Sequence, residues 1–384
     1  MKSLSLRVLP LVLTLLSIAL LHAQINVGVS TLPRVGVSLS GGAGGMATQV
    51  LSNDLKRSGT LLPTSAGEGE YQATGTADAG GVTGSLVDKR SGQTLFSQSF
   101  TGTARTATHE FADAITKAIT GLPGFASSKI AFVSGGGIAK ELWYGDIDGY
   151  NARAITHDNV DAASPALSHD GTKLAYTSYK SGYPDVYVID LSSGTRNRIA
   201  YFPGINSGPS FSPSGSDLAL TLSKDGNPEI YTIPVDGGSP NRITRTRGSE
   251  TSPSWSPDGN QLVFCSDDRG SPQLYISSAQ GGGDWDHLMT GDSYCTKPDW
   301  SGDGKLIAFT ARIAGQFQIG VFDLATRSAQ LVSSGGGEDP AWTRDSRHLV
   351  YANNGRLYLL DTKTKLSLPI PVGPSACSEP TVSR

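Results

Sequence analysis

The sequence predicts a mostly β protein: a C-terminal six-bladed β-propeller that is closed by the last strand of the chain, preceded by a small α+β domain. A phrase that begins with Pro and has Leu, Phe or Trp two residues later, followed by Ser or Thr, returns every 42 to 45 residues in the later part of the chain, and the earlier part lacks this repeat. A length of 384 residues is also long for one ordinary core. We therefore expect a signal peptide over 1–23, an α+β domain over 24–126 and a propeller over 127–384.

The first residues, MKSLSLRVLPLVLTLLSIALLHA, have the layout of a secretory signal peptide. Lys2 and Arg7 precede an apolar stretch, which is followed by the small residue Ala23. A membrane anchor is less favoured because the stretch is shorter than the ~20 residues that a spanning helix needs, and Pro10 interrupts it. We expect an exported mature chain that starts at Gln24 and has no transmembrane segment.

Charge and cysteine content limit the classes of partner and of covalent link. The formal net charge is −3, and removal of Lys2 and Arg7 would bring it to about −5, which argues against nucleic-acid binding. The three cysteines, Cys265, Cys295 and Cys377, can form at most one disulfide. Burial of Cys265 as a small hydrophobe is favoured over pairing, and the disulfide state stays open.

The region over 24–126 reads as alternating strands and helices. VGVSLS at 35 looks like a strand, and a glycine-rich turn leads into MATQVLSNDLKRSG, where Val50, Leu51 and Leu55 fall at helical spacing. The segments YQATGTA, GSLVDKRSG and TLFSQSF read as short strands. HEFADAITKAITG then predicts a second amphipathic helix that Gly121 and Pro123 stop.

The repeat itself predicts propeller blades. The phrase begins at Pro165, Pro209, Pro253, Pro298 and Pro340, and two alternating apolar runs follow each occurrence, such as QLVFCS and QLYISS. A shorter fourth run completes most units. Runs rich in Val, Ile, Tyr and Phe between Ser-Pro-Asp-Gly turns are typical of strands, and four strands in 40 to 45 residues are typical of a blade.

The two ends of the repeat region complete one another. KIAFVS at 129–134 is a second-strand phrase with no first-strand phrase before it. EPTVSR at 379–384 is a first-strand phrase with nothing after it. We expect a sixth blade that is assembled from both ends and closes the ring.

The inner-strand phrase predicts architecture rather than chemistry. Its second position is small, as crowding near the axis requires: Ala166, Ser210, Ser254, Asp299, Ala341 and Thr381. Its third position would fill the wedge between blades as core: Leu167, Phe211, Trp255, Trp300, Trp342 and Val382. In these phrases Asp299 is the only ionisable side chain.

No catalytic motif stands out. G-x-S-x-G, H-x-x-x-H and C-x-x-C are all absent from the sequence, so we expect no enzyme activity and no transition-metal site. GDIDGYN at 145–151 resembles the start of a calcium loop, but the later ligands are missing and a plain turn is favoured.

Acidic residues gather just before the inner-strand prolines. The set is Asp161, Asn206, Glu250, Asp292, Glu338, Asp339 and Glu379, all of them acidic except Asn206. Each alone reads as a solvated turn residue. Together, around one mouth of the channel, they would focus negative potential that attracts a basic partner segment or a cation such as calcium. No other cofactor is expected.

The order of these segments resembles the TolB family of the Tol-Pal system of Gram-negative envelopes. The resemblance rests on DLKRSG after a glycine turn, HEFADAITKAITG, SKIAFVS, ELWYGDIDGYNARAIT and IAYFPGINSGPSFSP. It implies a monomeric, non-catalytic periplasmic scaffold that links inner-membrane TolA to the outer-membrane lipoprotein Pal, maintains envelope integrity and supports outer-membrane constriction at cell division.

The resemblance also implies a binding site. Pal would contact the channel mouth, and Ile205, Asn206, Gly208 and Thr251 stand at family positions of that contact. Glu250, Asp292, Glu338 and Asp339 join them as candidates from the acidic set. TolA would communicate with the front domain and the N-terminal segment, where no contact residue is assigned.

The alternative interpretation is a secreted propeller enzyme or carbohydrate-binding protein that uses the central channel. It would need His, Glu or Arg side chains that converge from the inner strands, and loops would have to supply most of them.

Overall fold

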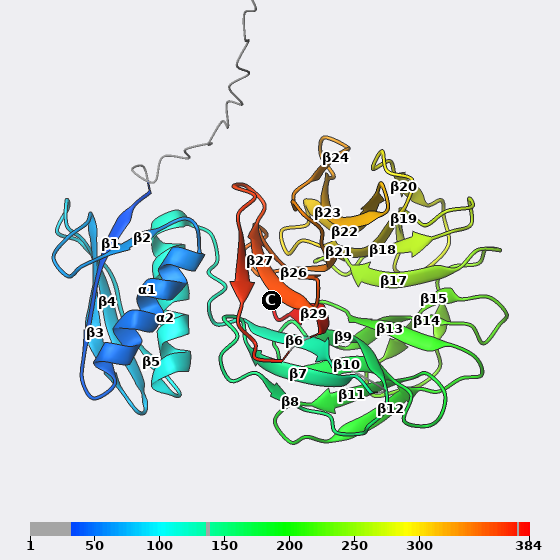
Figure 1. The fold of residues 1–384 in the computed structure, drawn as a ribbon, viewed down its shortest axis with the longest axis horizontal. Helices are drawn as coiled ribbons and strands as arrows, with labels where there is room; N and C mark the ends of the chain where they lie inside the picture. Colours follow the sequence, from blue (N-terminus) through cyan, green and yellow to red (C-terminus); the bar gives the residue numbers. More distant parts are fainter. Residues whose placement is uncertain (1–31, 136–138, 375) are drawn as a thin grey trace, which may run out of the picture. The chain divides into compact units, whose positions relative to one another are not determined.

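The predicted propeller and α+β domain are both present in the computed structural model (Figure 1), which describes residues 32–384 except 136–138 and 375. The predicted signal peptide and the expected start at Gln24 lie outside the described residues. Among the helices that the structure describes, none is both long and apolar enough to cross a membrane.

A five-stranded sheet with two helices forms the front domain. Its strand order is β2-β1-β3-β4-β5, with β2 and β3 parallel to β1 and the remaining pairs antiparallel. Both helices contact the sheet on one face (Figure 1). The elements are β1 (Arg34–Ser40), α1 (Gly44–Arg57), β2 (Leu62–Thr64), β3 (Tyr71–Asp78), β4 (Gly81–Asp88), β5 (Thr94–Thr101) and α2 (Ala104–Thr120). The sequence predicted all of them except β2, which has only three residues.

The ends and packing of α2 follow from its sequence. Thr103 Oγ1 accepts a hydrogen bond from the Thr106 backbone N–H at 3.2 Å, and the helix ends at Gly121, whose φ is +76°. Phe111 is fully buried against the sheet, where a Cβ atom on Gly84 would lie 2.6 Å from the Phe111 Cζ. A glycine is therefore required at position 84.

Five blades each consist of four consecutive antiparallel strands, counted here from the inner strand outward. They are β9 (Ala162–Leu167), β10 (Lys173–Ser178), β11 (Asp185–Asp190) and β12 (Arg196–Ala200); β13 (Asn206–Phe211), β14 (Asp217–Leu222), β15 (Glu229–Pro234) and β16 (Asn241–Arg242); β17 (Glu250–Trp255), β18 (Gln261–Ser266), β19 (Gln273–Ser278) and β20 (Asp286–Leu288); β21 (Cys295–Trp300), β22 (Leu306–Ile313), β23 (Gln316–Asp323) and β24 (Ser328–Leu331); β25 (Glu338–Trp342), β26 (His348–Asn353), β27 (Arg356–Asp361) and β28 (Ser367–Ile370).

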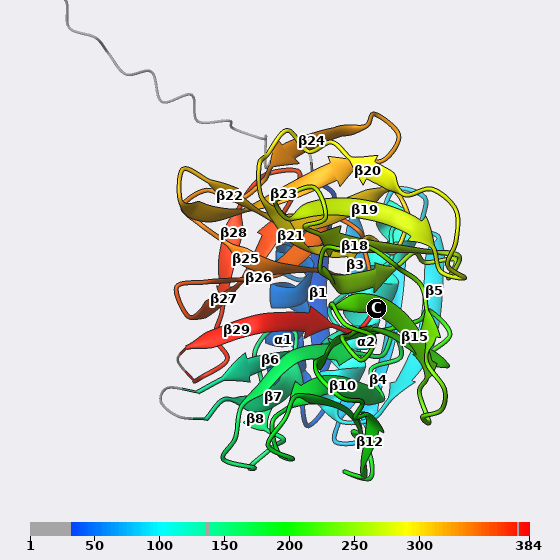
Figure 2. The same cartoon turned by 90° about the vertical axis from the view of Figure 1, so that its right-hand side faces the viewer.

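The sixth blade closes the ring as predicted. Its order is β29-β6-β7-β8, with β29 (Cys377–Val382) from the end of the chain beside β6 (Lys129–Ser134), β7 (Glu141–Asp146) and β8 (Arg153–Ala154) (Figure 2). Val382 pairs with Ile130, and the Lys129 backbone N–H donates to Ser383 Oγ at 2.8 Å. The predicted turn at GDIDGYN connects β7 to β8.

The third-position residues of the inner strands are buried, which confirms their assignment to the core. Two indoles also join neighbouring blades: Trp255 Nε1 donates to the Ser210 carbonyl at 3.1 Å, and Trp342 Nε1 donates to the Asp299 carbonyl at 3.0 Å. All three cysteines are free and buried. The repeated aromatic residues therefore pack between adjacent blades, and two of them also link the blades by hydrogen bonds.

The repeated Ser-Pro-Asp-Gly phrase forms the turn between the first two strands of a blade. In the third complete blade Ser256 Oγ donates to Asp258 Oδ1 at 2.6 Å, and Gly259 has a φ of +73°. The same hydroxyl-to-carboxylate bond recurs in the blades that begin with β9, β21 and β25. This part of the repeat is structural.

Candidate partner-binding site at the channel mouth

Each inner strand is interrupted by a bulge at the residue before its proline. The strand pairing shifts register there in all six blades, and this residue has a φ between +49° and +61°. Residues with side chains rarely adopt positive φ, and a bulge of this kind redirects a side chain. We call the six residues the channel ring: Ser164, Gly208, Ser252, Lys297, Asp339 and Glu379.

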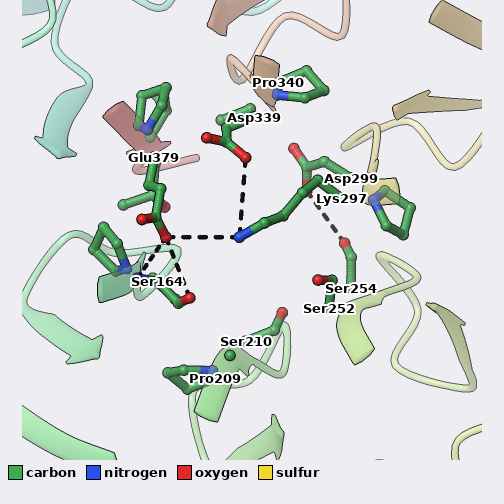
Figure 3. Close-up of a pocket in the computed structure, with 18 of the residues that line it drawn as sticks. Ser164, Pro209, Ser210, Ser252, Ser254, Lys297, Asp299, Asp339, Pro340 and Glu379 are labelled. Atoms are coloured by element: carbon green, nitrogen blue, oxygen red, sulfur yellow. Dashed lines mark hydrogen bonds and ion pairs between the residues drawn. The ribbon is translucent and has the colours of Figure 1, made fainter. Parts of the chain in front are cut away.

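The channel ring lines a central cavity of about 150 Å³ (Figure 3). The six prolines and the small second-position residues line the same cavity, which confirms that the second position faces the axis. Each blade therefore turns one residue toward the channel, and these residues range from glycine and serine to lysine, aspartate and glutamate.

Charge in the channel ring is concentrated on one side. Lys297 Nζ lies 3.6 Å from Glu379 Oε2 and 3.9 Å from Asp339 Oδ1, and Glu379 also accepts the Ser164 backbone N–H at 2.8 Å (Figure 3). Burial opposes the charge on Lys297, but Asp339 and Glu379 together raise the pKa of its ammonium group. Burial raises the pKa of Asp339 even though Lys297 is near. Asp339 and Glu379 were among the acidic residues expected to attract a cation. In the structure the ammonium group of Lys297 already balances their charge.

Asp299 lines the same cavity and is engaged in structural contacts. Its carboxylate accepts the Trp342 backbone N–H at 2.7 Å and the Ser254 hydroxyl at 3.2 Å, and it pairs with the guanidinium of Arg384. Arg384 Nη1 also donates to the Trp300 carbonyl at 2.6 Å. The expectation that Asp299 is the only ionisable residue of the inner strands is wrong, because these strands begin before their prolines and include Lys297.

Two of the predicted contact residues are fully buried. Asn206 holds its own loop, accepting the Phe202 backbone N–H at 2.9 Å and donating to the Phe202 carbonyl at 2.8 Å. Glu250 accepts hydrogen bonds from Ser266 at 2.6 Å and Thr246 at 2.7 Å. The predicted acidic ring is corrected here, because these side chains point into the blades rather than to the channel mouth.

The other predicted residues divide between channel and surface. Gly208 and Asp339 belong to the channel ring. Thr251, which directly precedes Ser252, and Asp292, in the loop before β21, are half-buried. Glu338 and Asp161 are exposed. The structure thus places the candidates in three environments, and their contact with a partner stays a prediction.

Exposed apolar side chains lie on the loops that flank these positions. Ile205 is 41% exposed, Tyr201 61% and Tyr183 74%. These residues occupy the loops from β12 to β13 and from β10 to β11, which emerge on the same side of the blade because adjacent strands are antiparallel. We call Tyr183, Tyr201 and Ile205 the mouth patch.

Sequence reasoning did not single out Lys297, Ser164 or Ser252. All three directly precede a repeated proline, so their position in the phrase was a usable signal. The sequence did not show that this one position has positive φ and turns into the channel.

A closed six-bladed propeller with a narrow, charged channel, behind a five-stranded α+β domain, defines the structural class. The family described as TolB beta propeller domain matches residues 116–384. The crystal structure of TolB from Acinetobacter baumannii is similar over 92% of this chain and 96% of that chain, with a TM-score of 0.80 and 28% identity. The chain belongs to the TolB family.

Curated relatives align over shorter segments. The Tol-Pal system protein TolB of Methylococcus capsulatus is 42% identical over 106 residues, which are 27% of this chain and 25% of that protein. The protein of the same name from Xanthomonas campestris pv. campestris (strain B100) is 36% identical over 148 residues, or 37% of this chain and 32% of that protein. These alignments span a quarter to a third of the relatives.

Proposed function

We propose that this protein is the periplasmic TolB component of a Tol-Pal system and acts as a non-catalytic scaffold. Its channel mouth binds a Pal-type lipoprotein, and its front domain and N-terminal segment communicate with a TolA-type inner-membrane protein. The consequence for the cell is envelope integrity and support for outer-membrane constriction at division. Family membership and the named Tol-Pal relatives support the proposal.

The observation that carries the binding face is the mouth patch. Two exposed tyrosines lie on neighbouring loops beside the exposed apolar Ile205, and tyrosine is a residue type that often anchors protein interfaces. The loop that carries Ile205 is held by buried Asn206 and by a 2.7 Å hydrogen bond from the Ile205 backbone N–H to Ser223 Oγ. A loop that is already ordered loses little entropy when a partner binds.

The small channel favours a protein partner over the alternative of a small-molecule enzyme or sugar binder. A cavity of about 150 Å³ is below the roughly 300–1,000 Å³ of pockets that enclose small ligands. Its charged groups are also paired with one another. Recognition through the loops around the mouth is therefore the better use of this surface.

The test is binding of the mature protein to the soluble domain of a Pal-type lipoprotein from the same organism, measured by calorimetry. Ile205→Asp should weaken binding at least tenfold, because it places an uncompensated charge at the centre of the apolar contact. Leu366→Asp is the matched control, since Leu366 is 58% exposed and lies on the β27–β28 turn at the opposite side of the ring.

Equal affinities for the wild type and both variants would contradict the mouth patch as the binding face. No binding by the wild type would contradict the proposed partner. Fractionation that finds the mature protein outside the periplasm would contradict the proposed location.

A further inference from the structure

His109 is a buried histidine with one unused ring nitrogen. It lies on α2 of the front domain, and its Nδ1 is 2.7 Å from Asp54 Oδ2 of α1. The residue is 2% exposed, and its Nε2 has no hydrogen-bond partner within the part of the chain that the structure describes. Buried polar atoms in folded proteins nearly always have a partner, so a missing ligand is the simplest explanation.

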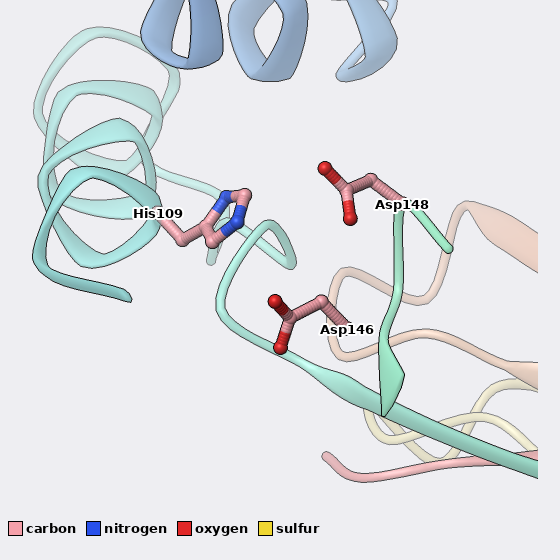
Figure 4. Close-up of side chains that lie close together, drawn as sticks. All are labelled: His109, Asp146 and Asp148. Carbon is pink, nitrogen blue, oxygen red and sulfur yellow. The ribbon is translucent and has the colours of Figure 1, made fainter. Parts of the chain in front are cut away.

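Two carboxylates of the propeller face this nitrogen. Asp146 ends β7 and Asp148 lies in the turn that follows, within the GDIDGYN segment. Each of the three side chains, His109, Asp146 and Asp148, offers one possible ligand atom. These three atoms lie within 4.8 Å of one another (Figure 4). An imidazole and two carboxylates from separate elements are thus gathered around one point.

Asp54 completes a recognised arrangement for metal ligation. A histidine that binds a metal through one ring nitrogen usually donates the other N–H to a carboxylate, which fixes the tautomer and makes the ligand more basic. The bond between Nδ1 and Asp54 leaves the lone pair of Nε2 free toward Asp146 and Asp148. One nitrogen and two carboxylate oxygens, with water as the fourth ligand, suit Zn²⁺ and similar ions.

We propose that His109, Asp146 and Asp148 form a binding site for a divalent transition metal, represented by Zn²⁺, with Asp54 as the residue that orients His109. The site is separate from the channel and does not depend on the proposed function. Its ligands come from α2 and from the β7–β8 turn, so the metal would join the front domain to the propeller.

Cations of the chain compete for the same carboxylates. Arg105 contacts Asp148 and lies 3.9 Å from Asp146, Lys129 pairs with Asp146, and Arg57 adds a further positive charge nearby. The metal must displace Arg105, whose guanidinium already lies 4.0 Å from the Tyr150 ring centroid and can stay there. The ligand atoms must also close to about 3.3 Å from one another around a tetrahedral Zn²⁺. We therefore expect a Kd in the micromolar range, about 1–50 μM.

The experiment uses the full mature chain after treatment with a chelator and gel filtration. Zn²⁺ is titrated by calorimetry, and Co²⁺ is titrated in parallel because its visible absorption reports coordination geometry. The variants are His109→Gln and Asp148→Asn. His157→Gln is the control, since His157 is an exposed histidine of the same chain.

The proposal expects one Zn²⁺ per chain, a Co²⁺ band with the intensity of a four- or five-coordinate site, and a higher Tm with metal. Affinity should fall at least tenfold in both variants and stay unchanged in the control. Asp148→Asn decides the question if His109→Gln does not fold, because it keeps the size of the side chain. The absence of one-to-one binding below about 100 μM in the wild type, or binding that both variants retain, would overturn the proposal.

Discussion

Two positions of the same inner strand, two residues apart, have opposite roles. The third residue before each proline is buried in every blade: Ala162, Asn206, Glu250, Cys295, Gly337 and Cys377. The residue directly before each proline belongs to the channel ring and lines the cavity. In a regular strand such residues would share a face. Because of the bulge, the two residues point in different directions. The third residue before the proline is buried in the blade, whereas the residue directly before the proline faces the channel and can vary in charge.

The largest expected effect comes from removing a buried side chain at the third position before the proline. Asn206→Ala leaves the Phe202 N–H and carbonyl without their partners, and the Pro184 carbonyl loses a bond of 3.1 Å. We expect the free energy of unfolding to fall by about 2–3 kcal/mol in urea denaturation. Ser252→Ala in the channel ring is the control and should change it by less than about 0.5 kcal/mol. Similar losses in both variants would remove the distinction between the two positions.

A smaller effect, which depends on pH, is expected at Glu250. Burial and the neighbouring Glu229 raise the pKa of Glu250 to about 7, whereas the pKa of Glu229 is lowered. The folded protein therefore holds a proton on Glu250 that the unfolded chain releases above about pH 4.5. The raised pKa of Glu250 alone corresponds to about 3 kcal/mol, and the lowered pKa of Glu229 acts in the opposite direction and offsets part of it. Stability should therefore fall as pH rises from about 4.5 to about 7, by roughly 2 kcal/mol.

Glu250→Gln mimics the protonated side chain and should remove most of this slope in thermal denaturation measured at several pH values. Asp190→Asn is the control. Hydrogen bonds from Ser192 and Ser193 lower the pKa of Asp190 to about 2, so this variant should leave the slope between pH 5 and 7 unchanged. A slope that survives Glu250→Gln would show that another group titrates.

The smallest effects are expected within the channel ring. Gly208→Ala should cost about 1 kcal/mol, because φ is +61° and no atom blocks the added methyl group. Ser252→Gly relieves the same strain and should change stability by about 0.5 kcal/mol or less, because the flexible glycine also favours the unfolded chain. Chemical denaturation of both variants would measure the pair. A Gly208→Ala variant that is as stable as the wild type would mean that the bulge is not strained.

Most of the fold could be predicted because the same pattern of apolar runs and turns recurs in each blade, so each type of strand is indicated several times. The apolar runs located the second and third strands of every blade. The phrases at Lys129 and Pro380, each without its partner nearby in the sequence, predicted the closure that the β29–β6 pair confirms. The short β2 was missed because three residues carry too little periodicity, and its pairing with β1 depends on a crossover through α1. The candidate site was less predictable because several residues lie close to each proline in the sequence, and only the one directly before the proline turns into the channel. The sequence does not show where the strand pairing shifts register.

The sequence alone determined the number of blades, the small residues at the axis, the aromatic wedges and the resemblance to the TolB family. These properties depend on local patterns that alternate with a period of two and recur with each blade. Only the tertiary structure decided that Lys297 meets Asp339 and Glu379, that Glu250 is buried, and that His109 faces Asp146 and Asp148. Those neighbours lie tens of residues apart, and their contact depends on the bulge geometry and on packing between elements, which no local pattern encodes.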